Sequence, residues 1–206
     1  MTFEQFHAIF SPLGCVSSAD MREQPFRFDK NSLTRWCENG YLVKLRNGLY
    51  AFPEYLENAD FRYFAASKMY VGSYVSLHTA LMFHGFISSQ PAGQVSCVSH
   101  LKTAEFRNLL GDFDFHCMKR ELVFGFEMME ETAFPFPMAT PEKALLDLFY
   151  LFPQYYDSEQ SLRNFALEEK RLFEEWNSQR MYDFLEFFRN SALERRISLF
   201  VRMFGV

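Results

Sequence analysis

The segment Met138 to Phe152, MATPEKALLDLFYLF, constrains the fold more than any other part of the chain, because it combines a helix start with a long apolar face. Thr140 can cap the helix, Pro141 suits the first helical position, and Glu142 suits the positive end of the helix dipole. Apolar residues then follow at steps of one, three and four, namely Ala144, Leu145, Leu148, Phe149 and Phe152. The spacing predicts one core-facing helix that ends before Pro153 and forms the buried centre of the larger part of the chain.

The composition limits the classes of protein to which the chain can belong. Its 206 residues give room for a small domain and a larger one, and 49% apolar with 18% aromatic residues favour a packed core over disorder. The first residues carry no basic leader and no stretch is long enough to span a bilayer, so we expect a soluble cytoplasmic protein without a membrane partner. With a net charge of −5, any DNA binding has to come from a local basic patch.

No pattern in the chain predicts a metal, a cofactor or a catalytic centre. The 4 cysteines lie far apart without a Cys-x-x-Cys pair, so we expect reduced thiols rather than disulfides or zinc ligands. His78 and His84 fall on different faces of one predicted helix, which disfavours a shared metal. Glu142 and Asp147 are about 140° apart round their helix and do not form a carboxylate pair. Binding rather than catalysis is the prediction, and an enzyme built around Glu142, Lys143 and Asp147 is the weaker alternative.

The pattern of residues 1–56 predicts three short helices followed by a β-hairpin. Apolar spacing and cap residues place the helices at 3–10, at 18–24 where Pro25 ends the second one, and at 30–39 with Asp29 as the cap. In the following segment YLVKLRNGLYAF, apolar residues alternate with polar ones up to Asn47-Gly48, the strongest short signal for a hairpin. Three helices and a hairpin indicate a winged helix-turn-helix, whose third helix enters the major groove while the hairpin follows the DNA backbone.

Charge supports a DNA-binding surface on these residues. From Arg22 to Arg46 the chain carries six basic and three acidic residues, a local charge of +3 in a chain that is −5 overall. The third helix offers side chains that can reach base edges, and the hairpin offers side chains that can hold phosphates. A solvated helix face explains the same helix pattern equally well. The residues predicted to contact DNA are Lys30, Asn31, Ser32, Thr34, Arg35, Lys44, Arg46 and Asn47.

Residues 57–206 are predicted to form a larger domain with a small antiparallel sheet. Helices are expected over 61–69 and from Ser73 or Ser76 to His84, and strands with alternating polarity over 94–101, 113–118 and 122–129. The first of these strands has the pattern of an edge or half-buried strand. Residues Phe134–Pro137 are expected to link the sheet to the central helix, and further helices follow, the last from Ala192 to Phe204.

Separated segments of the chain resemble one known family, in the same order. ATPEKALLDLFYL resembles the signature helix of the AbiEi-like abortive-infection antitoxins, the DNA-binding half of type IV toxin–antitoxin pairs. LTRWCENGYLVKLRNGLYA is similar to the second half of that family's winged helix, and YVSLHTALMFHGFI is similar to the motif that opens its antitoxin domain. LRNFALEEKRLFEEW and FFRNSALERRISLF are similar to two of its later segments.

The resemblance implies an α+β fold in which a winged helix-turn-helix over residues 1–56 precedes an α/β antitoxin-like domain over 57–206 with a small sheet and a helical C-terminus. It implies a transcriptional autorepressor that binds double-stranded DNA at promoter inverted repeats. The few basic residues on the third helix favour two copies binding together, as a homodimer on DNA. It also implies an antitoxin that counters a nucleotidyltransferase-like toxin without needing a stable complex with it. The antitoxin motif carried over consists of Ser76, Thr140, Glu142, Lys143 and Asp147.

A stand-alone winged-helix regulator, or a protein-interaction module without a toxin partner, is the main alternative. The acidic total charge and the sparse positive charge on the third helix favour the interaction module, in which a degenerate winged helix binds a partner protein rather than DNA. A strong decrease of DNA affinity with added salt would discriminate the two, because only phosphate contacts release counterions.

Overall fold

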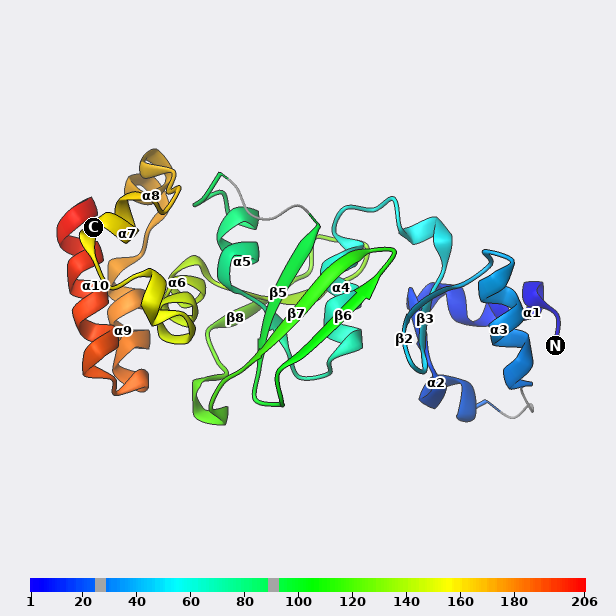
Figure 1. The fold of residues 1–206 in the computed structure, drawn as a ribbon. Helices are drawn as coiled ribbons and strands as arrows, with labels where there is room; N and C mark the ends of the chain where they lie inside the picture. The colour runs from blue at the N-terminus through cyan, green and yellow to red at the C-terminus, as the bar shows by residue number, and fades with distance from the viewer. Residues whose placement is uncertain (25–28, 89–92) are drawn as a thin grey trace.

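The computed structural model describes residues 1–24, 29–88 and 93–206, and its fold is mixed α+β (Figure 1). Figure 1 shows the N-terminal helices with a small sheet at one end, a larger sheet in the middle, and the C-terminal helices at the other end. Within these ranges no helix is long and apolar enough to cross a membrane. Pro25, predicted to end the second helix, lies outside the described residues.

Three helices and a three-stranded antiparallel sheet form the N-terminal part. The helices are α1 (Phe3–Phe10), α2 (Ser18–Arg22) and α3 (Lys30–Glu38), and the strands, in the order β1-β3-β2, are β1 (Cys15–Ser17), β2 (Val43–Arg46) and β3 (Leu49–Ala51). Each helix starts at a residue whose side chain accepts a backbone hydrogen bond from the first turn, namely Thr2, Ser17 and Asp29. The predicted hairpin is confirmed, with Gly48 at φ 75° in its turn. Strand β1 has only three residues and was not predicted.

The small sheet and its flanking residues contribute buried side chains to two cores, which joins the N-terminal part to the rest of the chain. One face packs against the three helices through Val16, Leu42 and Phe52. The other face enters the main core beside α4 (Phe61–Met69), the helix predicted over 61–69, and contributes Cys15, Val43, Leu45, Leu49 and Ala51. Successive residues of a strand point to opposite faces, so β1 supplies Val16 to one core and Cys15 to the other.

The larger sheet has six strands in the order β6-β7-β5-β4-β9-β8. They are β4 (Tyr74–Val75), β5 (Gln94–Ser99), β6 (Ala104–Asn108), β7 (Gly111–Cys117), β8 (Phe126–Met129) and β9 (Phe136–Ala139). The pairs β5–β7 and β4–β9 are parallel, and the other pairs are antiparallel. The predicted sheet is present, but it is mixed rather than antiparallel, because the unpredicted strand β6 lies between β5 and β7 in the chain and these two run parallel.

Two further expectations for this region are corrected. The segment from Gln94 is not an edge strand, because β5 lies between β7 and β4 and is almost wholly buried. The segment Phe134–Pro137 is not a linker, since β9 begins at Phe136 and pairs with both β8 and β4. Pro137 is tolerated within this inner strand because β4 is short and pairs with β9 only at Met138.

The central helix is confirmed as α6 (Pro141–Leu151), with Thr140 accepting a hydrogen bond from the backbone N–H of Lys143 at 3.4 Å. It is buried from Glu142 through Phe149 and packs against α5 (Leu77–Phe83), α9 (Ser178–Phe188) and α10 (Ser191–Phe204). Helices α7 (Glu159–Arg163) and α8 (Glu169–Glu175) complete the C-terminal part. Short 3-10 helices join the elements at Ser11–Leu13, Pro53–Tyr55, Arg120–Leu122 and Pro153–Tyr155.

The start of α5 differs from the expected helix. Tyr74 and Val75 are strand residues, and Ser76 precedes the helix without capping it through its side chain. Leu77, the first helical residue, is 1% exposed and has φ 58°, a conformation that costs free energy for a residue with a side chain. The chain therefore turns sharply from β4 into α5.

Leu49→Ala tests whether the two cores unfold together. Leu49 is 3% exposed in the shared sheet, so its truncation should lower the free energy of unfolding by about 2–5 kcal/mol. In variants with a single tryptophan, Trp36 in the N-terminal core and Trp176 beside the main core should report the same lowered urea midpoint. Leu109→Ala, at a residue that is 80% exposed, is the control. A midpoint that falls for one tryptophan only would contradict the shared core.

Candidate functional site

Helix α3 is held by one face and leaves the other in solvent. Leu33 and Trp36 are buried, and the ring of Trp36 lies 4.9 Å from that of Phe6 on α1. Asp29 caps the helix by accepting the backbone N–H of Asn31 at 3.0 Å. Of the residues predicted to contact DNA, the exposed ones are Asn31, Thr34 and Arg35, and Ser32 is half-buried. Lys30 begins the helix, and its side chain lies outside the described part.

The hairpin presents its polar residues beside this helix. Lys44 and Asn47 are exposed, and Arg46 is half-buried. Burial raises the pKa of the Cys37 thiol on α3, and the charge of Lys44 opposes that shift, so Lys44 lies within electrostatic range of α3. The backbone N–H of Leu42, directly before β2, donates to the carbonyl oxygen of Trp36 on α3 at 3.2 Å. The common DNA-contact surface stays a prediction.

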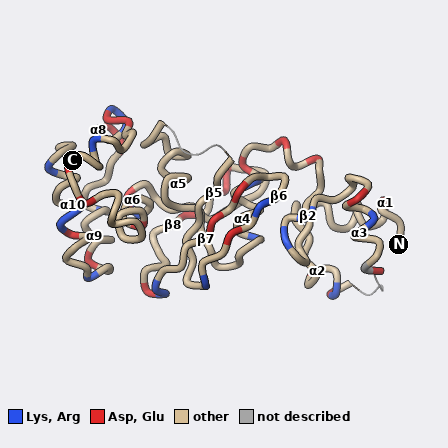
Figure 2. Tube along the Cα trace, viewed as in Figure 1, with Lys and Arg blue, Asp and Glu red and all other residues tan. Residues whose placement is uncertain are grey.

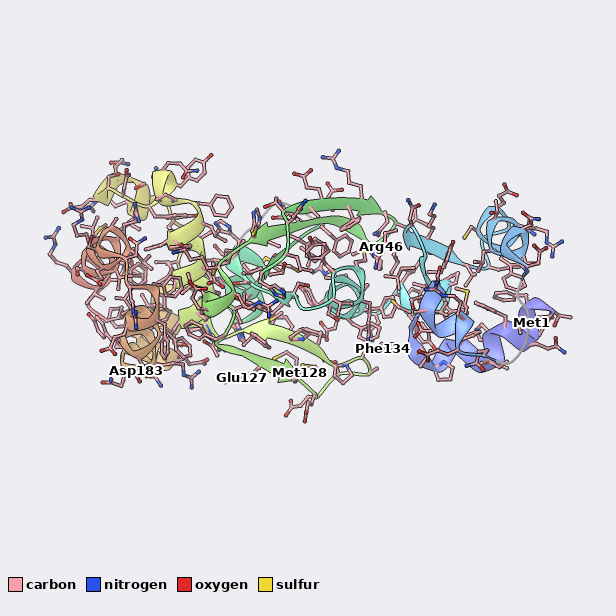
Figure 3. All side chains as sticks on the ribbon, turned by 90° about the horizontal axis from the view of Figure 1, so that it is seen from below. Met1, Arg46, Glu127, Met128, Phe134 and Asp183 are labelled. Carbon is pink, nitrogen blue, oxygen red and sulfur yellow. The ribbon has the colours of Figure 1, made fainter. Side chains whose placement is uncertain are left out.

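The hairpin also lies against the larger sheet. The amide Nδ2 of Asn108 on β6 donates to the carbonyl oxygen of Leu45 at 3.1 Å. Between the two edges runs a groove of about 390 Å³ whose charged residues are Lys44, Arg46, Arg107 and Glu105. Figure 3 shows Arg46 at this junction, and Figure 2 shows basic residues on both β2 and β6. The guanidinium of Arg46 is oriented by a hydrogen bond from Nη1 to the carbonyl oxygen of Asn47 at 3.1 Å.

The residues carried over as the antitoxin motif meet in the main core. Lys143 and Asp147, one turn apart on α6, form an ion pair with both side chains 0% exposed. The second carboxylate oxygen of Asp147, Oδ2, accepts hydrogen bonds from the hydroxyls of Tyr74 and Ser76, each at 2.8 Å. Lys143 Nζ also donates to the hydroxyl oxygen of Tyr74 at 2.9 Å. We call Tyr74, Ser76, Lys143 and Asp147 the buried polar cluster.

Attraction between the two charges of the buried polar cluster offsets part of the free-energy cost of removing them from water. Burial lowers the pKa of Lys143 and raises that of Asp147, and the attraction between the two acts against both shifts. Aromatic rings add to the stabilisation of the cation, since Nζ of Lys143 lies 5.0 Å from the ring centre of Phe124 and 5.3 Å from that of Phe188. The cluster ties β4 and the start of α5 to α6.

Thr140 and Glu142 have separate roles at the start of α6. Thr140 caps the helix, whereas Oε1 of Glu142 accepts the backbone N–H of Asn177 at 3.0 Å. The other oxygen of Glu142 is buried 3.7 Å from Nη1 of Arg180. All residues of the predicted motif are buried and bonded within the chain, and their part in antitoxin activity stays a prediction. Tyr74 was not predicted, since no spacing in the sequence distinguishes it from an ordinary core tyrosine.

His78 and His84 are each hydrogen-bonded within the chain. Nε2 of His78 lies 3.0 Å from the hydroxyl of Tyr156, and Nε2 of His84 lies 2.9 Å from the carbonyl oxygen of Ala139. Among the residues that the structure describes, no group of three or more His, Cys, Asp or Glu side chains could hold a metal ion.

No protein-family model matches the chain, and no curated protein matches it either.

Lys143→Met tests how much the buried polar cluster contributes to the free energy of unfolding. It leaves Asp147 buried without its counter-ion and should lower the free energy of unfolding by about 3–5 kcal/mol in urea denaturation. Adding Asp147→Leu should recover most of the loss, because an apolar pair removes both charges. Lys170→Met is the matched control, since Lys170 pairs with Glu174 at the same helical spacing but in solvent. Equal losses for the two lysines would show that the buried pair does not hold the fold.

Proposed function

We propose that this protein is a DNA-binding transcriptional autorepressor and the antitoxin of a type IV toxin–antitoxin system, as its resemblance to the AbiEi-like antitoxins implies. The observation that carries the DNA-binding part is the exposed face of α3 beside the hairpin of β2 and β3. The element order α1-β1-α2-α3-β2-β3, with strands ordered β1-β3-β2, supports a winged helix-turn-helix. In this proposal α3 is the recognition helix and the hairpin is the wing.

The side chains of α3 suit direct contact with bases. Asn31, Thr34 and Arg35 project into solvent from the side opposite Leu33 and Trp36, so the helix can enter a groove without disturbing its packing. Arginine pairs with guanine and asparagine with adenine at the major-groove edge. The buried side of α3 fixes the orientation of these groups before DNA arrives.

The wing is proposed to hold phosphates. Lys44 and Asn47 are exposed at the hairpin, and Arg107 on β6 shares the groove with Lys44 and Arg46. Phosphate contacts fix the register of a protein on the duplex without reading its sequence. The cations are few, so two copies on an inverted repeat would supply the affinity that one copy lacks.

The antitoxin activity is proposed to lie in the larger part of the chain. The buried polar cluster fixes α6 against β4 and α5, so it would maintain the surface that opposes a nucleotidyltransferase-like toxin. Since the cluster is closed to solvent, contacts to a toxin or its substrate would come from exposed residues around it.

A stand-alone regulator or protein-interaction module without a toxin partner is the second candidate. The interaction module is favoured by the hydrogen bond between Asn108 and Leu45, because this bond holds the hairpin against β6 instead of leaving it free to follow DNA. In the interaction module the exposed face of α3 would contact a protein.

Arg35→Ala and Lys44→Ala separate DNA binding from the protein-interaction module. In gel-shift titrations on DNA from the protein's own promoter, Arg35→Ala should cost about 1–3 kcal/mol of binding free energy and relax the sequence preference. Lys44→Ala should weaken binding to all sequences and reduce the salt slope by about one. Lys170→Ala, on the surface of α8, is the control for loss of one positive charge. DNA binding that is insensitive to salt and to both variants would favour the protein-interaction module.

Co-expression with the neighbouring open reading frame tests the antitoxin part. The full chain and its Arg35→Ala variant should both restore growth, because the proposed recognition helix lies at the end of the molecule opposite the C-terminal helices. Only the wild type should repress a reporter driven by the shared promoter. Repression without rescue, or a harmless neighbour, would leave a regulator and refute the antitoxin.

A further inference from the structure

A cavity of about 810 Å³ lies over the polar face of β5, β6 and β7. None of the residues predicted to contact DNA lines it, but it shares Glu105 with the groove of Lys44, Arg46 and Arg107. The sheet forms its floor with Gln94, Ser96, Glu105, Asp114 and His116. Phe152, Tyr155 and Tyr156, around the 3-10 helix after α6, form a wall, and Leu77 and His78 close the side next to α5. The strained backbone of Leu77 thus borders this cavity.

The floor of the cavity aligns two carboxylates. Ser96 is directly opposite Asp114 in the β5–β7 pairing, and Glu105 is directly opposite Asp114 in the β6–β7 pairing. The three side chains therefore lie in one row across the sheet. Like charges at directly opposite positions of an antiparallel pair are destabilising. Asp114 is paired with His116, whereas among the described residues Glu105 forms no ion pair, although it also borders the groove of Lys44, Arg46 and Arg107.

Asp114 is held as an anion at this place. Burial raises its pKa, but hydrogen bonds from His116, from Gln94 Nε2 at 3.1 Å and from Ser96 Oγ at 3.0 Å outweigh burial and lower the pKa below its ordinary value. Burial also lowers the pKa of His78, which favours its neutral form. None of the described lining residues is a lysine or arginine.

The wall of the cavity suits a flat cation. Tyr155 is 62% exposed, and the ring of Phe152 lies edge-on to His116 at 5.1 Å between ring centres. Aromatic faces attract cations, and a guanidinium group can stack on a ring while its N–H groups donate to a carboxylate. An anionic ligand would meet the carboxylates of Glu105 and Asp114 here, whereas a guanidinium would donate hydrogen bonds to them.

We propose that this cavity binds a small organic cation with a guanidinium group, which donates to Glu105 and the Asp114 side of the floor and stacks on the ring of Tyr155. This inference is independent of the proposed function, since a protein that binds no DNA would keep the cavity. A guanidinium is preferred to a simple ammonium because its planar fork matches a carboxylate and an aromatic face together.

Isothermal titration of the full chain with agmatine tests the proposal. Agmatine should bind, and N-carbamoylputrescine, which replaces the guanidinium by a neutral urea of similar shape, should bind about tenfold more weakly or not at all. Glu105→Gln and Tyr155→Ala, both at exposed residues, should each lower the affinity for agmatine by about tenfold. Glu121→Gln, an exposed carboxylate on a different groove, should leave the affinity unchanged.

Unfolding curves of the variants would show that they remain folded. Absence of agmatine binding at millimolar concentration would overturn the proposal. It would equally be overturned if the urea analogue bound as tightly as agmatine, or if Glu105→Gln and Tyr155→Ala both bound agmatine like the wild type.

Discussion

The ion pair of Lys143 and Asp147 is the interaction on which the larger part of the molecule depends. Two charges in a dry core are tolerated only when each has close partners, and here Tyr74 and Ser76 supply them from β4 and the entry to α5. A purely apolar contact between the same elements could slide by a residue with little penalty. The directional bonds of the buried polar cluster allow one arrangement, so they set where α6 lies relative to the sheet.

Local signals made part of this fold predictable. The Thr140-Pro141 start of α6 and the Asn47-Gly48 turn depend on neighbours in the sequence, and both occur where they were predicted. Strands β4 and β9 could not be predicted in the same way, because β4 has two residues and β9 contains a proline. Their pairing depends on partners more than sixty residues apart along the chain, such as Val75 with Met138. Sequence periodicity carries no information on such pairings.

The candidate sites also differ in whether local sequence signals identified them. Periodicity around Leu33 and Trp36 identified the exposed face of α3, because a helix that buries one side must expose the other. The motif residues on α6 came from resemblance, and their complete burial was not foreseen because polar side chains are normally expected in solvent. The carboxylate row was missed since β6 itself was not predicted, and Glu105 meets Asp114 only through the pairing of β6 with β7.

The small sheet has a consequence for how such a chain can change over evolution. Because Val43, Leu45 and Leu49 belong to the main core while Leu42 and Phe52 belong to the N-terminal core, no cut through the chain separates the two without exposing apolar surface. The N-terminal part therefore cannot be exchanged between proteins as an independently folding domain. A hybrid with a new N-terminus would have to inherit the complementary face of α4 as well, so both halves are expected to diverge in step.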